Sequence, residues 1–376
     1  MFEKYFMNYL RQRFKMIFNK KGVIFMQQPT YDEQVTMKNE MKLRELCAEL
    51  PAFCKEFFRG IEPTTSSRTR IAYAYDLKIF FHFLQEKYPD IEDGDLKTWP
   101  VTVLDKVTLT QLEEYLDYLR LYEDAENKVH TNEERGRMRK TASMRTFYKF
   151  FYRKQVIKNN TASLLNLPKK HEHAIVRLEI DEIAKLLDAV EEGDNLTKFQ
   201  KKYHNKTKIR DLAILTLLLG TGIRVSECVG LDISNLDFET NGMKIHRKGG
   251  SDVVLYFGEE VREALLDYLE ERKKIIPKEG SEDALFLSMQ KRRISVRAVE
   301  NLVKKYARPV TPLKTITPHK LRSTYGTQLY QETGDIYLVA DVLGHKDVNT
   351  TRKHYAAMED QRRRMAAGKV QLREKE

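Results

Sequence analysis

The segment LLNLPKKHEHAIV, residues 164–176, divides the chain into two parts with different sequence patterns. Its proline and its run of polar and charged residues are typical of a linker between domains. His171 and His173 could form half of a metal site, but no second ligand pair has matching spacing, which favours a solvated or phosphate-contacting linker. A chain of 376 residues is long enough for two domains with their own cores.

The part before this segment has the apolar periodicity of helices. One predicted helix begins after the possible capping hydroxyls of residues 64–67. A second extends over Leu109–Tyr122, where leucines recur at helical spacing. The predicted apolar stripe of the first helix consists of Ile71, Tyr75, Ile79, Phe80 and Phe83, and that of the second consists of Leu112, Leu116 and Leu119.

A third predicted helix, in RMRKTASMRTFYKFFYRKQVIKNN, has two faces of different chemistry. Met144, Phe147 and Phe151 can face a core, while Arg145, Lys149 and Arg153 follow one another at intervals of four residues on another face. One helix can thus pack through one side and contact phosphate through the other.

The net charge of +11 is unevenly distributed along the chain. Acidic residues outnumber basic ones between Glu86 and Glu134, whereas the segment from Arg135 to Lys170 has basic residues and no acid. A solvated basic face is one interpretation, but so sharp a change beside aromatic residues favours nucleic-acid binding. The candidate DNA-binding residues are Arg135, Arg137, Arg139, Lys140, Arg145, Lys149, Arg153, Lys154, Lys169 and Lys170.

The part after the linker mixes helices with a short β-structure. EIDEIAKLLDAVEEG and IRDLAILTLLLGTG are predicted helices that end at glycine. MKIHRKGGSDVVLYFG has β-branched and aromatic residues on both sides of two glycines, which predicts a hairpin with Lys248 at its turn. Further helices are predicted at Glu259–Ile275, at Ser295–Tyr306, at Pro318–Glu332, and from near Asp335 and near Asn349.

Composition excludes several classes of protein. Three cysteines with no paired spacing argue against disulfides and against a structural zinc site, so a reducing cytoplasm is the simplest compartment. No apolar stretch reaches the roughly 20 residues that span a bilayer. Residues 1–30 form a basic tail, whose first 25 residues lack the features of a signal peptide; a true start at Met26 would make these 25 residues an artefact.

Two short motifs contain candidate anion-binding residues. Arg224 follows a predicted helix end, and Glu227 lies one turn later, where it could support the guanidinium; an ordinary surface pair is equally compatible with this spacing. His319 and Arg322 in TPHKLRST lie on one face of a first helical turn and could bind one phosphate. An HxxR motif also arises by chance, so it is weak by itself.

Three further residues complete the candidate set. Lys248 at a hairpin turn could reach into a site as a proton donor, although exposed turn lysines are common. His345 follows Gly344 after an apolar stretch, and Tyr355 follows in a predicted helix. A lone tyrosine is more often a packing residue than a nucleophile.

The order of these residues resembles that of the tyrosine recombinase family, which includes lambda-integrase-like and Xer-type site-specific recombinases. The boxes TGIRVSECVGL, TPHKLRSTYGT and LGH resemble those of the family, and RTFYKFFYRKQVI resembles part of its core-binding domain. Ser323 stands where the family often has histidine. The resemblance covers about residues 35–360 and implies that the catalytic residues are Arg224, Lys248, His319, Arg322, His345 and Tyr355, supported by Glu227.

The resemblance also implies a fold that is mainly α with a small β-sheet. The expected domains are an all-helical, SAM-like core-binding domain at 31–165, a linker at 166–178, an α+β catalytic domain at 179–358 and a C-terminal helix or tail at 359–376.

The implied reaction is DNA cleavage and rejoining through a 3′-phosphotyrosyl intermediate. By resemblance, Tyr355 attacks the phosphate that Arg224 and Arg322 hold, His319 accepts a proton, His345 donates a hydrogen bond and Lys248 protonates the 5′ oxygen. The resemblance implies no cofactor and no metal, and the chain has no nucleotide-binding loop of the GxxxxGK[ST] type.

The implied partners are a specific double-stranded DNA site and three further protomers, which form a tetramer through the C-terminal helix, with an accessory bending or directionality factor as a further possibility. Integration or excision of a mobile element and resolution of chromosome dimers both remain open. The alternatives are a type IB topoisomerase-like activity and a noncatalytic DNA-binding regulator with the same fold.

Overall fold

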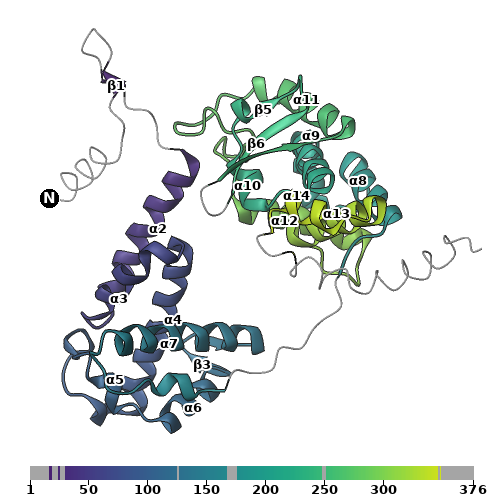
Figure 1. Cartoon of the computed structure of the whole chain (residues 1–376). Coiled ribbons are helices and arrows are strands. Elements are labelled where there is room, and N and C mark those ends of the chain that lie inside the picture. Colours follow the sequence, from purple (N-terminus) through teal and green to yellow (C-terminus); the bar gives the residue numbers. More distant parts are fainter. Residues whose placement is uncertain are drawn as a thin grey trace, which may run out of the picture. The chain divides into compact units, whose positions relative to one another are not determined.

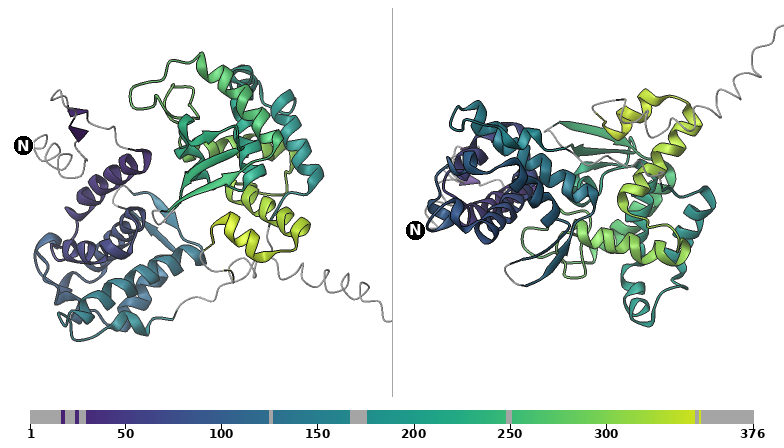
Figure 2. Two further views of the ribbon diagram at one scale, coloured as in Figure 1. Left: turned by 45° about the horizontal axis from the view of Figure 1, so that its top comes forward. Right: turned by 90° about the horizontal axis from the view of Figure 1, so that it is seen from below.

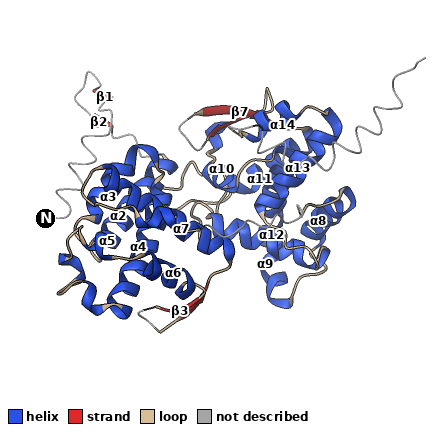
Figure 3. Cartoon of the chain, turned by 60° about the horizontal axis from the view of Figure 1, so that its bottom comes forward, coloured by secondary structure: helices blue, strands red, loops and turns tan. Residues whose placement is uncertain are grey.

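The structure is a computed structural model that describes residues 17–18, 24–25, 30–124, 127–166, 176–247, 251–345 and 348. It divides into two compact units, Met1–Glu172 and His173–Glu376 (Figure 1). The boundary between the units falls in the segment predicted as a linker, whose residues 167–175 lie outside the described part. Helices dominate both units (Figure 3), in agreement with the predicted fold class.

In its described residues, unit 1 is a helical domain with two pairs of short antiparallel strands. Its helices are α2 (Tyr31–Cys47), α3 (Cys54–Ile61), α4 (Ser67–Lys87), α5 (Val103–Lys106), α6 (Leu109–Tyr118) and α7 (Glu134–Arg153). Its strands are β1 (Ile17–Phe18), β2 (Ile24–Phe25), β3 (Leu121–Glu123) and β4 (Val129–Thr131), which pair antiparallel as β1 with β2 and β3 with β4. Helices α2 and α3 were not predicted.

The core of unit 1 is largely aromatic. Phe147 and Phe151 of α7 are fully buried and lie edge-to-face with one another, and Phe147 also meets Phe57 of α3 and Phe81 of α4 in the same geometry. Such pairs add about 0.5–1.5 kcal/mol each beyond the area that they bury. The apolar face predicted for α7 is therefore confirmed as a core face.

Two details of the predicted helices in unit 1 are wrong. In α4 the predicted stripe includes Tyr75, which is exposed, whereas Leu77 and Leu84 are buried. The helix predicted to reach Tyr122 ends at Tyr118, because the chain then enters β3, where Tyr122 pairs with His130 of β4. The prediction of an all-helical domain therefore missed this hairpin, since three-residue strands have too little alternation to be recognised.

In its described residues, unit 2 combines seven α-helices and one short 3-10 helix (Ile233–Asn235) with one small sheet. The α-helices are α8 (Ile180–Glu192), α9 (Lys198–Thr221), α10 (Val225–Gly230), α11 (Glu259–Lys273), α12 (Val296–Val310), α13 (Pro318–Thr333) and α14 (Ile336–Leu343). The strands are β5 (Leu236–Asp237), β6 (Gly242–His246) and β7 (Asp252–Tyr256), drawn as green arrows in Figure 2. No helix in the described part of the chain is long and apolar enough to cross a membrane.

Helix α9 is the central helix of unit 2. Its C-terminal half, from Ala213 to Leu219, is buried nearly all round, and it contacts α8, α11 and α13. A helix that is apolar on every side is stable only inside a core. It ends at Thr221, and the capping residue Gly222 has a φ of 61°, in the left-handed region that glycine adopts without strain.

The predicted hairpin around Lys248 is confirmed by its two strands. β6 and β7 pair antiparallel, with His246 opposite Asp252, and β5 extends the sheet on the other edge of β6. The N–H of Arg247 donates to the carbonyl of Ser251 at 2.9 Å and closes the described part of the hairpin. Lys248 itself lies outside the described residues.

Candidate active site

Arg224 is held in place by Glu227 at the start of α10. Arg224 is the residue before this helix, and its Nη1 donates to Oε1 of Glu227 at 2.8 Å. The other carboxylate oxygen, Oε2, accepts from the backbone N–H of Arg224 at 2.9 Å. The carboxylate of Glu227 is buried, whereas Arg224 is partly exposed. The contact proposed from their spacing is therefore present, and it directs a charged guanidinium toward the surface of the site.

Arg322 joins three elements of unit 2 from inside the core. Its side chain on α13 is 6% exposed, and its Nη1 donates to the carbonyl of Gly222 at 2.6 Å. Its Nη2 donates to the carbonyl of Leu343, the last residue of α14. A buried guanidinium requires such acceptors, because an unpaired buried charge is strongly destabilising. Arg322 thus ties the turn after α9 to the end of α14.

The C-terminal end of α14 accepts hydrogen bonds from three arginines. The last carbonyl groups of a helix have no partner within it and carry partial negative charge. Here the carbonyl of Gly344 accepts from Nη2 of Arg224 at 3.0 Å, and that of Leu343 accepts from Arg322. Arg247 donates through Nη1 to the carbonyl of Asp341 at 3.1 Å and through Nη2 to that of Val342 at 2.7 Å. Four consecutive carbonyls are therefore occupied by guanidinium groups.

Gly344 allows this close approach. Its φ of 61° favours glycine, and a Cβ atom at this position would lie 2.5 Å from Cζ of Arg247. Any side chain here would therefore push the guanidinium away from the end of α14. The sequence places this glycine directly before His345, so the turn that positions the histidine depends on the same glycine.

The two candidate histidines differ in their exposure. His345 is partly buried, and its backbone N–H donates to the carbonyl of Ala340 at 2.9 Å, which fixes the turn after α14. His319 is exposed in the first turn of α13, one turn before Arg322, where Thr317 caps the helix and Pro318 begins it. The structure thus brings Arg224, Arg322 and His345 together and places His319 on the helix that carries Arg322.

The described part of the site contains three guanidinium groups, which are bound by the carboxylate of Glu227 and by the C-terminal carbonyls of α14. Burial lowers the pKa of Arg247 below its ordinary value, with the neighbouring charge of Arg224 acting in the same direction and Glu227 acting against it. Burial also raises the pKa of the Cys228 thiol to about 12, so this neighbour stays neutral. The excess of positive charge suits the site to an anion such as a phosphate.

Arg247 was not among the residues predicted from the sequence. An arginine close to two glycines in the sequence suggests only a solvated turn residue. A hydrogen bond from its side chain to a distant backbone carbonyl leaves no pattern in the sequence, so the role of Arg247 could not be predicted. Lys248 and Tyr355, the predicted proton donor and nucleophile, lie outside the described residues.

The predicted DNA-binding residues of unit 1 differ in their exposure. Arg135, Lys149 and Arg153 are exposed on α7, and Lys154 is exposed and pairs with a carboxylate of α3. Of the other members that the structure describes, Arg137 and Arg145 are partly buried, Arg139 is exposed and pairs with Asp76, and Lys140 is buried. Lys169 and Lys170 lie outside the described part.

Lys140 corrects this set. Its side chain is buried, its Nζ donates to Oδ1 of Asn132 at 3.1 Å and lies 3.8 Å from Oδ1 of Asp76. Burial lowers the pKa of Lys140 and raises the pKa of Asp76. Lys140 therefore belongs to an internal polar cluster of unit 1 and is not on the surface where a DNA phosphate could reach it.

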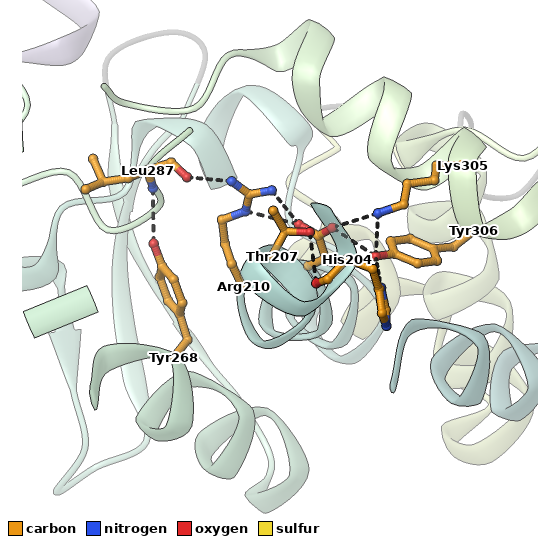
Figure 4. Close-up of polar contacts among 8 residues, drawn as sticks. His204, Thr207, Arg210, Tyr268, Leu287, Lys305 and Tyr306 are labelled. Carbon is orange, nitrogen blue, oxygen red and sulfur yellow. Dashed lines mark hydrogen bonds and ion pairs between the residues drawn. The ribbon is translucent and has the colours of Figure 1, made fainter. Parts of the chain in front are cut away.

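A second buried polar cluster in unit 2 involves different residues from those of the site. Figure 4 shows Arg210, Lys305 and Tyr306 directed toward a common centre, which is the carboxylate of Asp211. Nη2 of Arg210 donates to it at 2.6 Å and the Tyr306 hydroxyl donates at 3.0 Å. Burial raises the pKa of Tyr306, which is the opposite of what a nucleophilic tyrosine requires. This cluster joins α9 to α12 and supports the fold.

Comparison with known proteins agrees with this geometry. The model of the phage integrase family matches residues 177–362, which include the part of unit 2 that carries the arginines. The tyrosine recombinase XerC of Caldanaerobacter subterraneus subsp. tengcongensis is 34% identical over 318 residues, covering 82% of this chain and 82% of the relative. The tyrosine recombinase XerD of Oceanobacillus iheyensis is 29% identical over 296 residues, covering 78% of this chain and 89% of the relative.

Solved structures show the same fold. A XerH site-specific recombinase bound to a palindromic difH substrate has a TM-score of 0.60 at 17% identity and covers 91% of this chain and 90% of its own. A lambda integrase dimer bound to a core site has a TM-score of 0.55 at 16% identity and covers 81% of this chain and 94% of its own. Extended similarity to XerC over both units, together with the family match on unit 2, shows that the chain belongs to the tyrosine recombinase (phage integrase) family of site-specific recombinases.

Proposed function

We propose that this enzyme cleaves and rejoins double-stranded DNA at a specific site through a 3′-phosphotyrosyl intermediate, with Tyr355 as the nucleophile. The observation that carries the proposal is the convergence of Arg224, Arg322 and His345 at the C-terminal end of α14. These residues come from three separate helices or turns, and each is a residue type that binds phosphate.

Arg224 and Arg322 would hold the nonbridging oxygens of the scissile phosphate. A guanidinium has five N–H donors, so Arg224 can bind Glu227 and Gly344 and still donate to a phosphate oxygen. Donors that are fixed before the reaction stabilise the charge of the five-coordinate transition state without reorganisation. His345 would add a hydrogen bond to the same group.

The proton transfers are assigned to His319 and Lys248. The phenol of a tyrosine has an ordinary pKa near about 10, so Tyr355 needs a proton acceptor as it attacks phosphorus, and His319 would take that proton. The Tyr355 oxygen–phosphorus bond forms, the bond from phosphorus to the 5′ oxygen breaks, and Lys248 would protonate this oxygen. Arginine and lysine supply the positive charge, so the proposed reaction uses no metal and no cofactor.

The proposed DNA partner is supported by the named complexes and by unit 1. The XerH and lambda integrase structures contain DNA, and α7 presents exposed Arg135, Lys149 and Arg153. These side chains would bind the phosphate backbone, which positions the protein without reading sequence. A linker at 166–178 would let the domains at 31–165 and 179–358 close on one duplex.

A tetramer on two duplexes would exchange the strands through a Holliday junction, with residues 359–376 of one protomer docked on the next. Deleting the chain after Met358 should weaken the pairing of two duplexes more than it weakens binding to one site; equal losses in a gel-shift assay would refute this arrangement. The similarity to XerC and XerD supports chromosome-dimer resolution, and integration or excision of a mobile element is the other form of the same reaction. An accessory bending or directionality protein would act at the DNA.

Covalent capture tests the proposal. Purified protein is incubated with sheared genomic DNA of the source organism, the mixture is denatured, and protein-linked fragments are sequenced. We expect adducts at one recurring sequence, with a free 5′ hydroxyl, and none with Tyr355→Phe. Adducts that persist in Tyr355→Phe would place the nucleophile elsewhere. Relaxation of supercoiled plasmid without recombinant products would indicate a type IB topoisomerase, and binding without adducts would indicate a noncatalytic regulator.

A further inference from the structure

Arg247 connects two elements that the proposed reaction uses together. It follows the last residue of β6 and directly precedes Lys248 in the chain. Its guanidinium donates to the carbonyls of Asp341 and Val342 at the end of α14, four and three residues before His345. One side chain therefore spans from the hairpin to the turn that carries the histidine.

The contact is specific in its geometry. Two donors on different nitrogens meet two successive carbonyls, and the guanidinium lies against Gly344, where even a Cβ atom would approach its Cζ to 2.5 Å. The backbone at Arg247 is also fixed, because its N–H donates to Ser251 across the hairpin. Because the guanidinium is planar and donates from two nitrogens, it fixes both the distance and the orientation of the end of α14, whereas the single ammonium group of a lysine fixes only the distance.

We propose that Arg247 is a positioning residue: it fixes the β6–β7 hairpin against the end of α14, and the proton donation assigned to Lys248, the next residue in the chain, depends on that contact. The inference rests on the proposed function of Tyr355 and Lys248 and adds a residue to it. Both Nη atoms of Arg247 donate to carbonyls of α14, so we assign it a positioning role and no contact with the phosphate. Misplacement of a reacting group by about 1 Å can cost about a hundredfold in rate.

A substrate with a better leaving group distinguishes a defect in proton donation from a defect in phosphate binding or in nucleophilic attack. When sulfur replaces the bridging 5′ oxygen, the Tyr355 oxygen–phosphorus bond forms, the phosphorus–sulfur bond breaks, and the electron pair leaves as a thiolate. A thiol has a pKa of about 8.5, against about 15.7 for water, so the sulfur leaves without a proton. A defect in proton donation therefore disappears on the sulfur substrate, whereas a defect in phosphate binding or in nucleophilic attack remains.

The experiment measures single-turnover cleavage of two duplexes that carry the site recovered by covalent capture, one with a bridging 5′ oxygen and one with a bridging 5′ sulfur. The proteins are the wild type, Arg247→Met, Arg247→Lys and Lys248→Ala. Arg272→Lys is the matched control, because Arg272 in the same unit also donates to backbone carbonyls, those of Glu282 and Ala284. Gel-shift affinity and melting temperature are recorded for each.

We expect Arg247→Met to cleave the oxygen duplex about 10- to 100-fold more slowly than the wild type and the sulfur duplex within about threefold of it. Lys248→Ala should show the same pattern, and Arg247→Lys, which can still reach one carbonyl, should recover part of the rate. DNA affinity should change by less than about twofold. Arg272→Lys should affect both duplexes equally, since it can act only through the stability of the fold.

Equal slowing of Arg247→Met on both duplexes, or no slowing, would overturn the inference. Should Arg247→Met fail to fold, the same comparison is made with Arg247→Lys, which keeps the charge. A wild type that forms no adduct with either duplex would refute the proposed function and this inference with it. If the wild type cleaves both duplexes but the sulfur duplex does not restore the cleavage rate of the Arg247 variants, the inference about Arg247 is refuted and the proposed function is not.

Discussion

Replacing Glu227 with glutamine removes the charge that holds Arg224 while preserving the shape of the side chain. Both carboxylate oxygens are used, one by the Arg224 guanidinium at 2.8 Å and one by its backbone N–H at 2.9 Å. Both partners are donors, and an amide has only one acceptor oxygen. In Glu227→Gln one of the two bonds is lost, and an NH2 group faces a donor in its place.

The cost follows from the burial of this pair. A hydrogen bond to a charged group contributes about 1.5–3 kcal/mol, and Glu227 is too buried for water to replace it. We expect unit 2 to lose about 2–3 kcal/mol of unfolding free energy, which corresponds to about 4–12 °C in melting temperature for a domain of this size. The freed Arg224 should also lower single-turnover cleavage by about 10- to 100-fold.

The chain allows the two units to be observed separately. Its single tryptophan, Trp99, is buried in unit 1, so tryptophan fluorescence reports on that unit, whereas far-ultraviolet circular dichroism reports on the helices of both. Glu227→Gln should lower the melting temperature of the unit 2 transition in circular dichroism and leave the Trp99 transition unchanged.

A matched control is Glu182→Gln. Glu182 also caps a helix of unit 2, accepting from the N–H of Glu179 at 2.8 Å and from Nζ of Lys314 at 2.6 Å, but it contacts none of the site arginines in the described structure. It should cost stability and spare cleavage. A unit 2 transition that is unchanged in Glu227→Gln, or cleavage that is slowed no more than in Glu182→Gln, would refute the role assigned to Glu227.

Two further predictions concern stability. Gly222→Ala places a side chain at a φ of 61° and against the ring of Tyr325, which should cost about 2–4 kcal/mol in the unfolding of unit 2; a change in circular dichroism melting of under 1 °C would contradict this. Burial lowers the pKa of His204 below its ordinary value of 6.5. Between the lowered pKa of the folded state and 6.5, the unfolded state therefore binds more protons than the folded state. The free energy of unfolding consequently falls as the pH drops below about 6.5. His204→Gln should therefore lose less melting temperature than the wild type between pH 7.5 and 5.5, and equal losses would show that another group titrates.

Local patterns predicted most of the elements. The apolar face of α7 follows from the period of Met144, Phe147 and Phe151, and the β6–β7 hairpin follows from two glycines between β-branched runs. These two predictions were correct because the helix and the hairpin depend on residues that are close together in the chain. Where the signal is short, as in β3 and β4, the prediction was wrong.

Predictions about individual charged side chains were less secure. Lys140 lies in the same basic run as Lys149, yet one is buried and the other exposed. The difference depends on Asp76, which is distant in the chain and whose buried carboxylate attracts the ammonium. A run of charged residues predicts the sign of the charge on a surface, but it does not show which of these side chains are buried beside a group of opposite charge.

The sequence by itself determined the residue types, the helical character of both units and the order of Arg224, Arg322 and His345 along the chain, from which the family resemblance followed. Only the tertiary structure decided that the two arginines and Arg247 meet at one helix end. Arg224 bonds a carbonyl 120 residues away, and every residue of the chain has a carbonyl, so no pattern of side chains marks the acceptor. The close approach exists because packing brings the last carbonyls of α14, which carry partial negative charge, within reach of three guanidinium groups at once.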